Sequence, residues 1–154
     1  MTTPLPDIDP ALPATDPAAM NEFNRLLIDQ FRACQGRLTG QLAGAPVLLL
    51  TTVGAKSGQA HTTPLGFVRD GRRYIVAASK AGALTNPDWC CNLFANPAAT
   101  VETGTETFTA HSTIANGEER IRLFKLLAAQ WPMQLGYQQK TTRRIPVVIL
   151  ERLR

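Results

Sequence analysis

The stretch LGFVRDGRRYIVAA, residues 65–78, decides the fold class of this chain. It places two apolar segments, Leu65 to Val68 and Tyr74 to Ala78, on either side of Asp70-Gly71. An aspartate followed by a glycine between two such segments is typical of a short β-hairpin loop, because glycine readily adopts the left-handed backbone that these loops need. The stretch therefore predicts two neighbouring antiparallel strands.

Further strands are predicted on both sides of this hairpin. Val47 to Val53 is apolar and β-branched, which is typical of a buried strand, and Ile145 to Leu150 has the same character. Thr100 to Glu102 and Thr107 to Thr113 alternate across Gly104 and predict a second hairpin. The strands form hairpins and do not alternate with helices, and no dinucleotide-binding or Walker motif is present. We therefore expect a small antiparallel barrel and not a Rossmann sheet.

Three helices are predicted outside this barrel. Asp16-Pro17 provides an N-cap and a first-turn proline for an amphipathic helix from about residue 17 to residue 34. Asn86-Pro87 opens a short helix that Asn96-Pro97 closes. A third helix starts near Asn116 and continues until Pro132 ends it.

Residues 1–16 are expected to form a flexible tail, and residues 17–154 a single domain. The tail holds four prolines, which cannot donate backbone hydrogen bonds to a helix or a central strand. The first 20 residues contain three aspartates and no lysine or arginine, so they carry −3 and the remainder of the chain carries +7, which together give the net charge of +4. Because the basic residues are scattered and follow no nucleic-acid-binding motif, we expect a small-molecule partner and no nucleic acid.

The composition argues against a metal site and a membrane-spanning segment. Cys34, Cys90, Cys91 and the two histidines have no metal-ligand spacing. The longest apolar run, residues 45–50, is far shorter than the roughly 20 residues that cross a bilayer. We expect a cytoplasmic protein, with peripheral contact to a membrane left open.

Two basic, glycine-containing turns are candidates for binding an anion. Gly54-Ala55-Lys56-Ser57-Gly58 follows the strand Val47 to Val53, and Ser79-Lys80-Ala81-Gly82 follows Tyr74 to Ala78. The backbone N–H groups of such turns can approach an anion closely, while lysine and serine add a charge and a hydroxyl. We expect the two turns to converge on one anionic ligand. Ordinary exposed turns are the alternative.

From Asn21 to Leu150 the chain resembles the deazaflavin-dependent nitroreductase family, whose members bind coenzyme F420 on a split β-barrel. Four blocks carry the resemblance: Gly54 to Gly58 with Thr63-Pro64-Leu65; Ala77 to Lys80; Pro87-Asp88-Trp89 with Asn92-Leu93 and Ala95-Asn96-Pro97; and Tyr137 with Lys140-Thr141 and Arg143 to Val147. The resemblance implies a mainly β fold, a split β-barrel of about six antiparallel strands with three to four peripheral helices. It also implies an F420-dependent reductase.

The resemblance assigns a coenzyme site, in which Lys56 and Ser57 match the family's phosphate-binding pair. The residues implied to contact the coenzyme are Ala55, Lys56, Ser57, Gly58, His61, Thr62, Thr63, Pro64, Leu65, Ala77, Ala78, Ser79, Lys80, Asp88, Trp89 and Asn92. The family commonly has arginine at His61, and an imidazole is shorter and carries less charge at neutral pH. By its residue type alone, Trp89 is more typical of a core position.

The acceptor side is predicted at residues 131–137, which we expect to be a loop that covers a pocket or plugs the barrel. The pocket residues are Trp131, Gln134 and Tyr137, and Gln134 stands where nitroimidazole-reducing members present a tyrosine. Ser79 is the favoured candidate for the catalytic proton donor, with Tyr137 or a water molecule as the alternatives. Arg143 and Arg144 are expected to be paired or solvated.

These residues predict hydride transfer from reduced F420 to a small electron-poor acceptor, such as a quinone, an enone or a nitroaromatic compound. Two alternatives stay open, an FMN-dependent oxidoreductase on the same barrel and a non-catalytic deazaflavin carrier. The protein could be a monomer or a homodimer.

Overall fold

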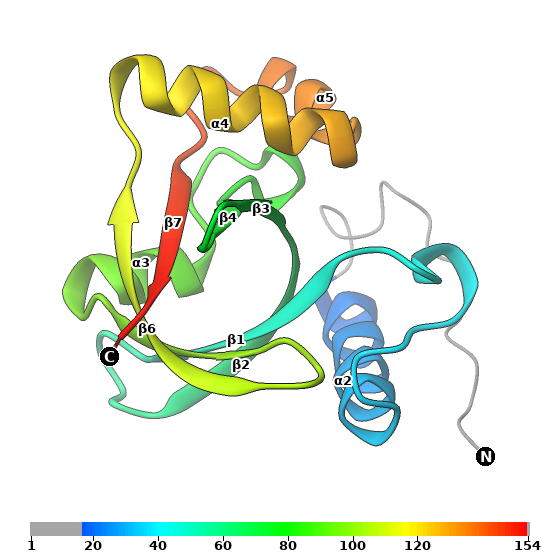
Figure 1. Ribbon diagram of the computed structural model, residues 1–154. Helices are drawn as coiled ribbons and strands as arrows, with labels where there is room; N and C mark the ends of the chain where they lie inside the picture. The colour runs from blue at the N-terminus through cyan, green and yellow to red at the C-terminus, as the bar shows by residue number, and fades with distance from the viewer. Residues whose placement is uncertain (1–16, 154) are drawn as a thin grey trace.

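The structure is a computed structural model that describes residues 17–153. Within this range seven strands form one sheet in which every neighbouring pair is antiparallel (Figure 1). The strands are β1 (Val47–Val53), β2 (Ala60–Gly66), β3 (Val68–Asp70), β4 (Arg73–Ala77), β5 (Ala98–Glu102), β6 (Thr107–Ile114) and β7 (Val147–Arg152). The predicted tail and the N-cap at Asp16 lie outside the described residues.

The order of the strands closes the sheet into a split barrel. It runs β2-β1-β5-β6-β7-β4-β3, so the two edge strands, β2 and β3, follow each other in the chain with only Phe67 between them. Because one residue spans a few ångströms, the sheet has to curl until its two edges meet. At this junction the Phe67 N–H donates a 3.0 Å hydrogen bond to the Pro46 carbonyl. The expected split β-barrel is confirmed.

The strand that the hydrophobic pattern missed is β2. Its sequence contains Pro64, which pairs with Leu49 of β1 and cannot donate a ladder hydrogen bond. An edge strand tolerates this proline, because one of its sides has no partner strand. The predicted segment Leu65 to Val68 is therefore divided between the end of β2 and the start of β3, while the Asp70-Gly71 hairpin is confirmed by the β3–β4 pairing.

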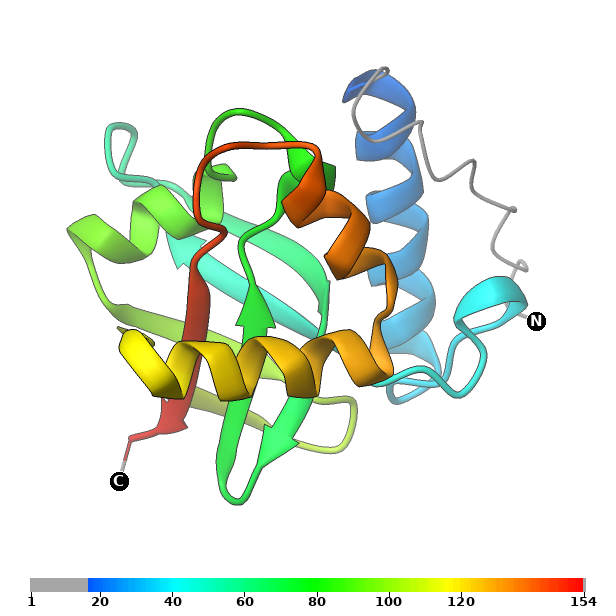
Figure 2. The ribbon, with the colours of Figure 1, turned by 90° about the horizontal axis from the view of Figure 1, so that it is seen from above.

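Four α-helices and two short 3-10 turns surround the sheet in the described part of the chain (Figure 2). They are α2 (Pro17–Ala33), α3 (Asp88–Ala95), α4 (Gly117–Gln130), α5 (Met133–Gln139), η1 (Gly40–Leu42) and η2 (Lys80–Gly82). The prediction of a loop at residues 131–137 is wrong, because most of this segment belongs to α5. Pro132 ends α4, and its own helical backbone, φ −59° and ψ −24°, starts the next helix.

Alternation along the strands builds a core on both faces of the sheet. Leu48 and Leu50 are fully buried inside the barrel, while Leu49 between them points outward and packs against Leu27 and Phe31 of α2. β4 and β7 similarly bury their outward-facing residues under α4. Because helices cover the outer face, apolar residues follow one another along these strands without polar interruption.

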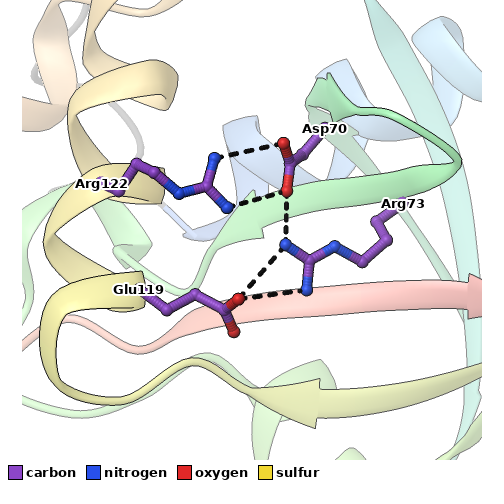
Figure 3. A network of polar contacts seen from close by, with 4 residues as sticks. All are labelled: Asp70, Arg73, Glu119 and Arg122. Carbon is purple, nitrogen blue, oxygen red and sulfur yellow. Dashed lines mark hydrogen bonds and ion pairs between the residues drawn. The ribbon is translucent and has the colours of Figure 1, made fainter.

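A network of charged side chains ties the β3–β4 hairpin to α4 (Figure 3). Arg122 donates hydrogen bonds of 3.2 and 3.0 Å to the two carboxylate oxygens of Asp70, and Arg73 bonds to the same carboxylate. Arg73 also lies 3.4 Å from Glu119 of α4. Hydrogen bonds from Arg122 and then Arg73 hold the pKa of Asp70 well below its usual range.

Candidate functional site

A cavity of about 800 Å³ lies between α2, the β1–β2 hairpin and α3. Three groups of residues line it: Asn21, Asn24, Arg25, Ile28 and Asp29 from α2; Thr52, Gly54, Ala55, Lys56, Ser57, His61, Thr62 and Thr63 from the hairpin; and Asp88, Trp89, Cys91 and Asn92 from α3. Many of the residues predicted to contact the coenzyme therefore share one cavity. The α2 residues were not predicted.

The hairpin loop between β1 and β2 presents Lys56 and Ser57 at the rim of this cavity. Its backbone closes tightly, since Gly54 N–H donates to the Gln59 carbonyl at 2.8 Å and Gly58 N–H donates to the Gly54 carbonyl at 2.9 Å. A Cβ at Gly54 would lie 2.5 Å from the Ser57 hydroxyl oxygen, so a larger residue here would push the Ser57 side chain out of its position. The Lys56 and Ser57 side chains are exposed and can reach a ligand in the cavity.

Asn92 of α3 fixes the position of this loop. Its side-chain carbonyl accepts a 3.0 Å hydrogen bond from the Ala55 N–H, and its amide donates a 3.0 Å bond to the Thr52 hydroxyl. Asn92 is buried, so both bonds are shielded from competing water. Ala55, the residue before Lys56, is thus hydrogen-bonded to α3. Asn92 is therefore a positioning residue for the loop.

The first residues of β2 continue the same wall. His61 lies opposite Thr52 in the β1–β2 register and is exposed, and Thr62 shares a 2.7 Å hydroxyl–hydroxyl hydrogen bond with Thr51. Pro64 and Leu65 are not among the residues that line the cavity, and Leu65 packs against the barrel interior. The predicted stretch therefore faces the cavity only as far as Thr63.

Trp89 has both of the roles that its sequence position left open. It is only 5% exposed and belongs to the same buried cluster in the barrel interior as Ala78, and it also contributes to the cavity wall. Trp89 therefore joins the cavity wall to the barrel core.

The second turn, at η2, does not line the 800 Å³ cavity. Ala77, Ala78 and Ser79 are buried, whereas Lys80 is exposed with a left-handed backbone of φ 47°. A single guanidinium holds this segment, because Arg143 donates to the carbonyls of residues 78, 79 and 83 and to the Asn86 side chain, at 2.7–3.2 Å. Arg143, which was expected to be either paired or solvated, is paired.

The predicted acceptor-side residues lie at the end of α4 and in α5. The Trp131 indole N–H donates to the Phe67 carbonyl at 3.2 Å, and its ring lies against Gly66, so Trp131 plugs the junction between β2 and β3. Tyr137 packs on the cluster under α4, and its backbone lies against Gly82 of η2; burial raises the pKa of its phenol. The Gln134 side-chain oxygen is buried without a hydrogen-bond partner among the described residues. None of the three lines the 800 Å³ cavity.

The α2 wall was missed because its signal is a helical spacing of polar residues, which most surface helices share. Asn21, Asn24, Arg25 and Ile28 recur every three or four residues and so occupy one face. That this face meets the β1–β2 loop depends on how α2 packs, which the spacing does not show. In residues 17–153 no group of histidine, cysteine, aspartate and glutamate could hold a metal, and no helix is long and apolar enough to span a membrane.

The donor set of the cavity suits an elongated anionic cofactor. Lys56 and Arg25 supply positive charge from two walls, and Ser57, Thr62 and Thr63 supply hydroxyl groups, while Asp29 and Asp88 add two carboxylates. The fold and the site together define a split β-barrel protein with a cavity that carries cationic and hydroxyl groups. The sequence profile of the F420H(2)-dependent quinone reductases matches residues 23–152, and the chain belongs to that family.

Individual relatives agree with this assignment. An F420H(2)-dependent quinone reductase of Mycobacterium tuberculosis is 38% identical over 126 residues, which cover 79% of this chain and 85% of the relative. A solved F420-H2 dependent reductase is 39% identical with a TM-score of 0.64, covering 69% of this chain and 94% of that one. A second solved chain with the same identity and TM-score, described as a domain-swapped dimer, covers 69% and 80%. The protein is therefore an F420-dependent reductase, and reduced coenzyme F420 is its hydride donor.

Proposed function

We propose that this enzyme reduces small, flat quinones, and that the cavity between α2, the β1–β2 hairpin and α3 holds the anionic tail of F420. The observation that carries the proposal is the position of Lys56 and Ser57 on a loop that Asn92 attaches to α3. The names of the relatives support a quinone as the acceptor. Bound F420 in its reduced form supplies a hydride, and that hydride with one proton converts a quinone to a hydroquinone.

The protein orients the reactants and supplies the proton. Lys56 offers a fixed positive charge to the tail, while Trp89 gives the cavity a flat apolar wall. Two candidate proton donors lie on the neighbouring η2–α5 side, Ser79 and Tyr137. The Tyr137 phenol carries its proton at neutral pH and can donate it as charge develops on the acceptor oxygen, although burial raises its pKa and makes it a weaker acid.

The tail site is tested by titrating the protein with oxidised F420 and measuring the dissociation constant from the fluorescence of the coenzyme. Lys56→Ala should weaken binding at least about tenfold, because charge-assisted contacts are worth roughly 1.5–3 kcal/mol. Lys125→Ala is the matched control, since Lys125 is exposed on α4 and lies outside the cavity lining. An unchanged dissociation constant in Lys56→Ala would remove the tail from this cavity.

The test of the acceptor is a comparison of turnover with reduced F420. A water-soluble naphthoquinone should be reduced much faster than a bicyclic nitroimidazole, because Gln134 has neither the ring nor the phenol of a tyrosine. Equal turnover of the two acceptors would contradict the quinone assignment. Loss of quinone turnover in Tyr137→Phe, with retention in Ser79→Ala, would identify Tyr137 as the proton donor.

A further inference from the structure

The α2 helix forms a wall of the cavity that is fixed in place. Leu27 and Phe31 on its core-facing side are buried against Leu49 of β1. Displacing the helix would expose these side chains to water, which is unfavourable because it returns a large apolar area to solvent. The polar stripe that contains Asn24 and Arg25 therefore faces the cavity permanently.

Arg25 is the cation of this wall, and two carboxylates hold it. Its guanidinium donates to both oxygens of Glu22, at 2.6 and 3.1 Å, and lies 3.4 Å from Asp29. Asp29 lines the cavity, whereas Glu22 is not among the lining residues. Glu22, the carboxylate that lies closer to Arg25, therefore binds its guanidinium from outside the cavity.

These ion pairs can exchange. The side chains of Arg25 and Glu22 are 59% and 58% exposed, and ion pairs at such positions contribute little free energy because water competes with both partners. A phosphate or carboxylate in the cavity would offer Arg25 the same two-pronged acceptor that Glu22 offers. Lys56 on the opposite wall would hold a second part of the same anion-bearing ligand.

From this arrangement we propose that Arg25 is a second receptor for the anionic tail of F420, and that Glu22 competes with the tail for its guanidinium. The inference rests on the proposed tail site. Arg25 exchanges its pairing with Glu22 for an anionic group of the coenzyme, so Glu22 lowers the affinity that Arg25 would otherwise provide. The Arg25–Glu22 pair thus adjusts the affinity for the coenzyme without contacting the substrate that accepts the hydride.

The experiment measures the dissociation constant of oxidised F420 for four proteins: wild type, Arg25→Gln, Glu22→Gln and the double variant. Arg25→Gln should weaken binding about threefold to tenfold, and Glu22→Gln should tighten it about threefold, by the loss or release of one charge-assisted contact. In the double variant the effect of Glu22→Gln should vanish, because Glu22 acts through Arg25. The salt dependence of binding should also decrease in Arg25→Gln.

Two controls separate this mechanism from a general effect of charge. Arg32→Gln removes another exposed arginine of α2, which pairs with Glu102 at 2.9 Å away from the cavity, and should leave the dissociation constant unchanged. Glu118→Gln removes an exposed carboxylate of α4 and should likewise have no effect. Melting temperatures of all variants establish that each is folded.

The outcomes distinguish this inference from the proposed function. If Lys56→Ala binds F420 as tightly as wild type does, the tail site itself is wrong. If Lys56→Ala is weakened but Arg25→Gln binds normally, the tail site stands and the role of Arg25 is overturned. If Glu22→Gln tightens F420 binding as much in the Arg25→Gln variant as it does in the wild type, Glu22 acts by net charge alone. The proposed competition is then overturned.

Discussion

The side-chain carbonyl of Asn92 accepts a hydrogen bond from the backbone N–H of Ala55 at 3.0 Å, so a residue of α3 holds the turn that carries Lys56. Asn92→Ala would leave this N–H and the Thr52 hydroxyl without their partner. We expect a loss of about 1–3 kcal/mol in the free energy of unfolding, measured by urea denaturation. F420 binding should weaken as well, because Lys56 is no longer held in place.

The control for Asn92 is Asn96→Ala, at the other end of α3. Asn96 is exposed and its side chain accepts only a local bond from the Ala98 N–H at 3.2 Å. Its loss should change neither stability nor coenzyme affinity by more than a small amount. Equal effects of the two variants would contradict a positioning role for Asn92.

The adjacent cysteines of α3 provide a chemical probe of the cavity. Burial raises the pKa of the Cys90 thiol to about 11, so this thiol should resist iodoacetamide at pH 8. Cys91 is exposed and lines the cavity, so it should be alkylated, and saturating F420 should protect it. Mass spectrometry of the α3 peptide, with Cys91→Ala as the control, measures both. Equally fast alkylation of Cys91 with and without F420 would place the coenzyme elsewhere.

The charge network around Asp70 predicts a dependence of stability on pH. The pKa of Asp70 is lowered in the folded protein, so its contribution is fully present above the pKa of the unfolded aspartate, about 3.9, and is lost as the pH falls through the folded value. Asp70→Asn should therefore reduce the free energy of unfolding by about 1 kcal/mol at pH 7. The difference from wild type should stay constant down to about pH 5 and shrink in stronger acid.

Glu118→Gln on α4 serves as the comparison for Asp70. Its carboxylate is exposed and does not belong to the network with Arg73 and Arg122. Thermal unfolding of the three proteins between pH 3 and pH 8 provides the measurement. A difference between wild type and Asp70→Asn that does not change with pH would show that the carboxylate charge is irrelevant.

His61 lies on the cavity wall where the family commonly has arginine. His61→Arg should tighten F420 binding about fivefold to tenfold, because a guanidinium offers a permanent charge and a two-pronged donor. His111→Arg is the matched control, since His111 is exposed on β6 and outside the cavity lining. Should both variants bind F420 as wild type does, His61 does not face the tail.

The sequence by itself determined the elements that depend on neighbouring residues. Asp70-Gly71 marked the β3–β4 hairpin, and Asn86-Pro87 and Asn96-Pro97 bounded α3 within two residues. Turn preferences and helix boundaries are set by backbone sterics over a few residues, so they can be read from short stretches. The blocks around Lys56 likewise carried the resemblance to F420-dependent enzymes, and the family assignment confirmed the coenzyme.

Only the tertiary structure decided which segments meet. β2 contains Pro64 and lacks a clear strand pattern, and it is a strand because β1 pairs with it along the whole segment. Arg143 holds residues about 60 positions earlier, and Arg25 faces the cavity with Lys56 because α2 packs on β1. Such contacts depend on the closure of the barrel and the burial of apolar faces, which are properties of the whole chain and leave no local signal in the residues that they bring together.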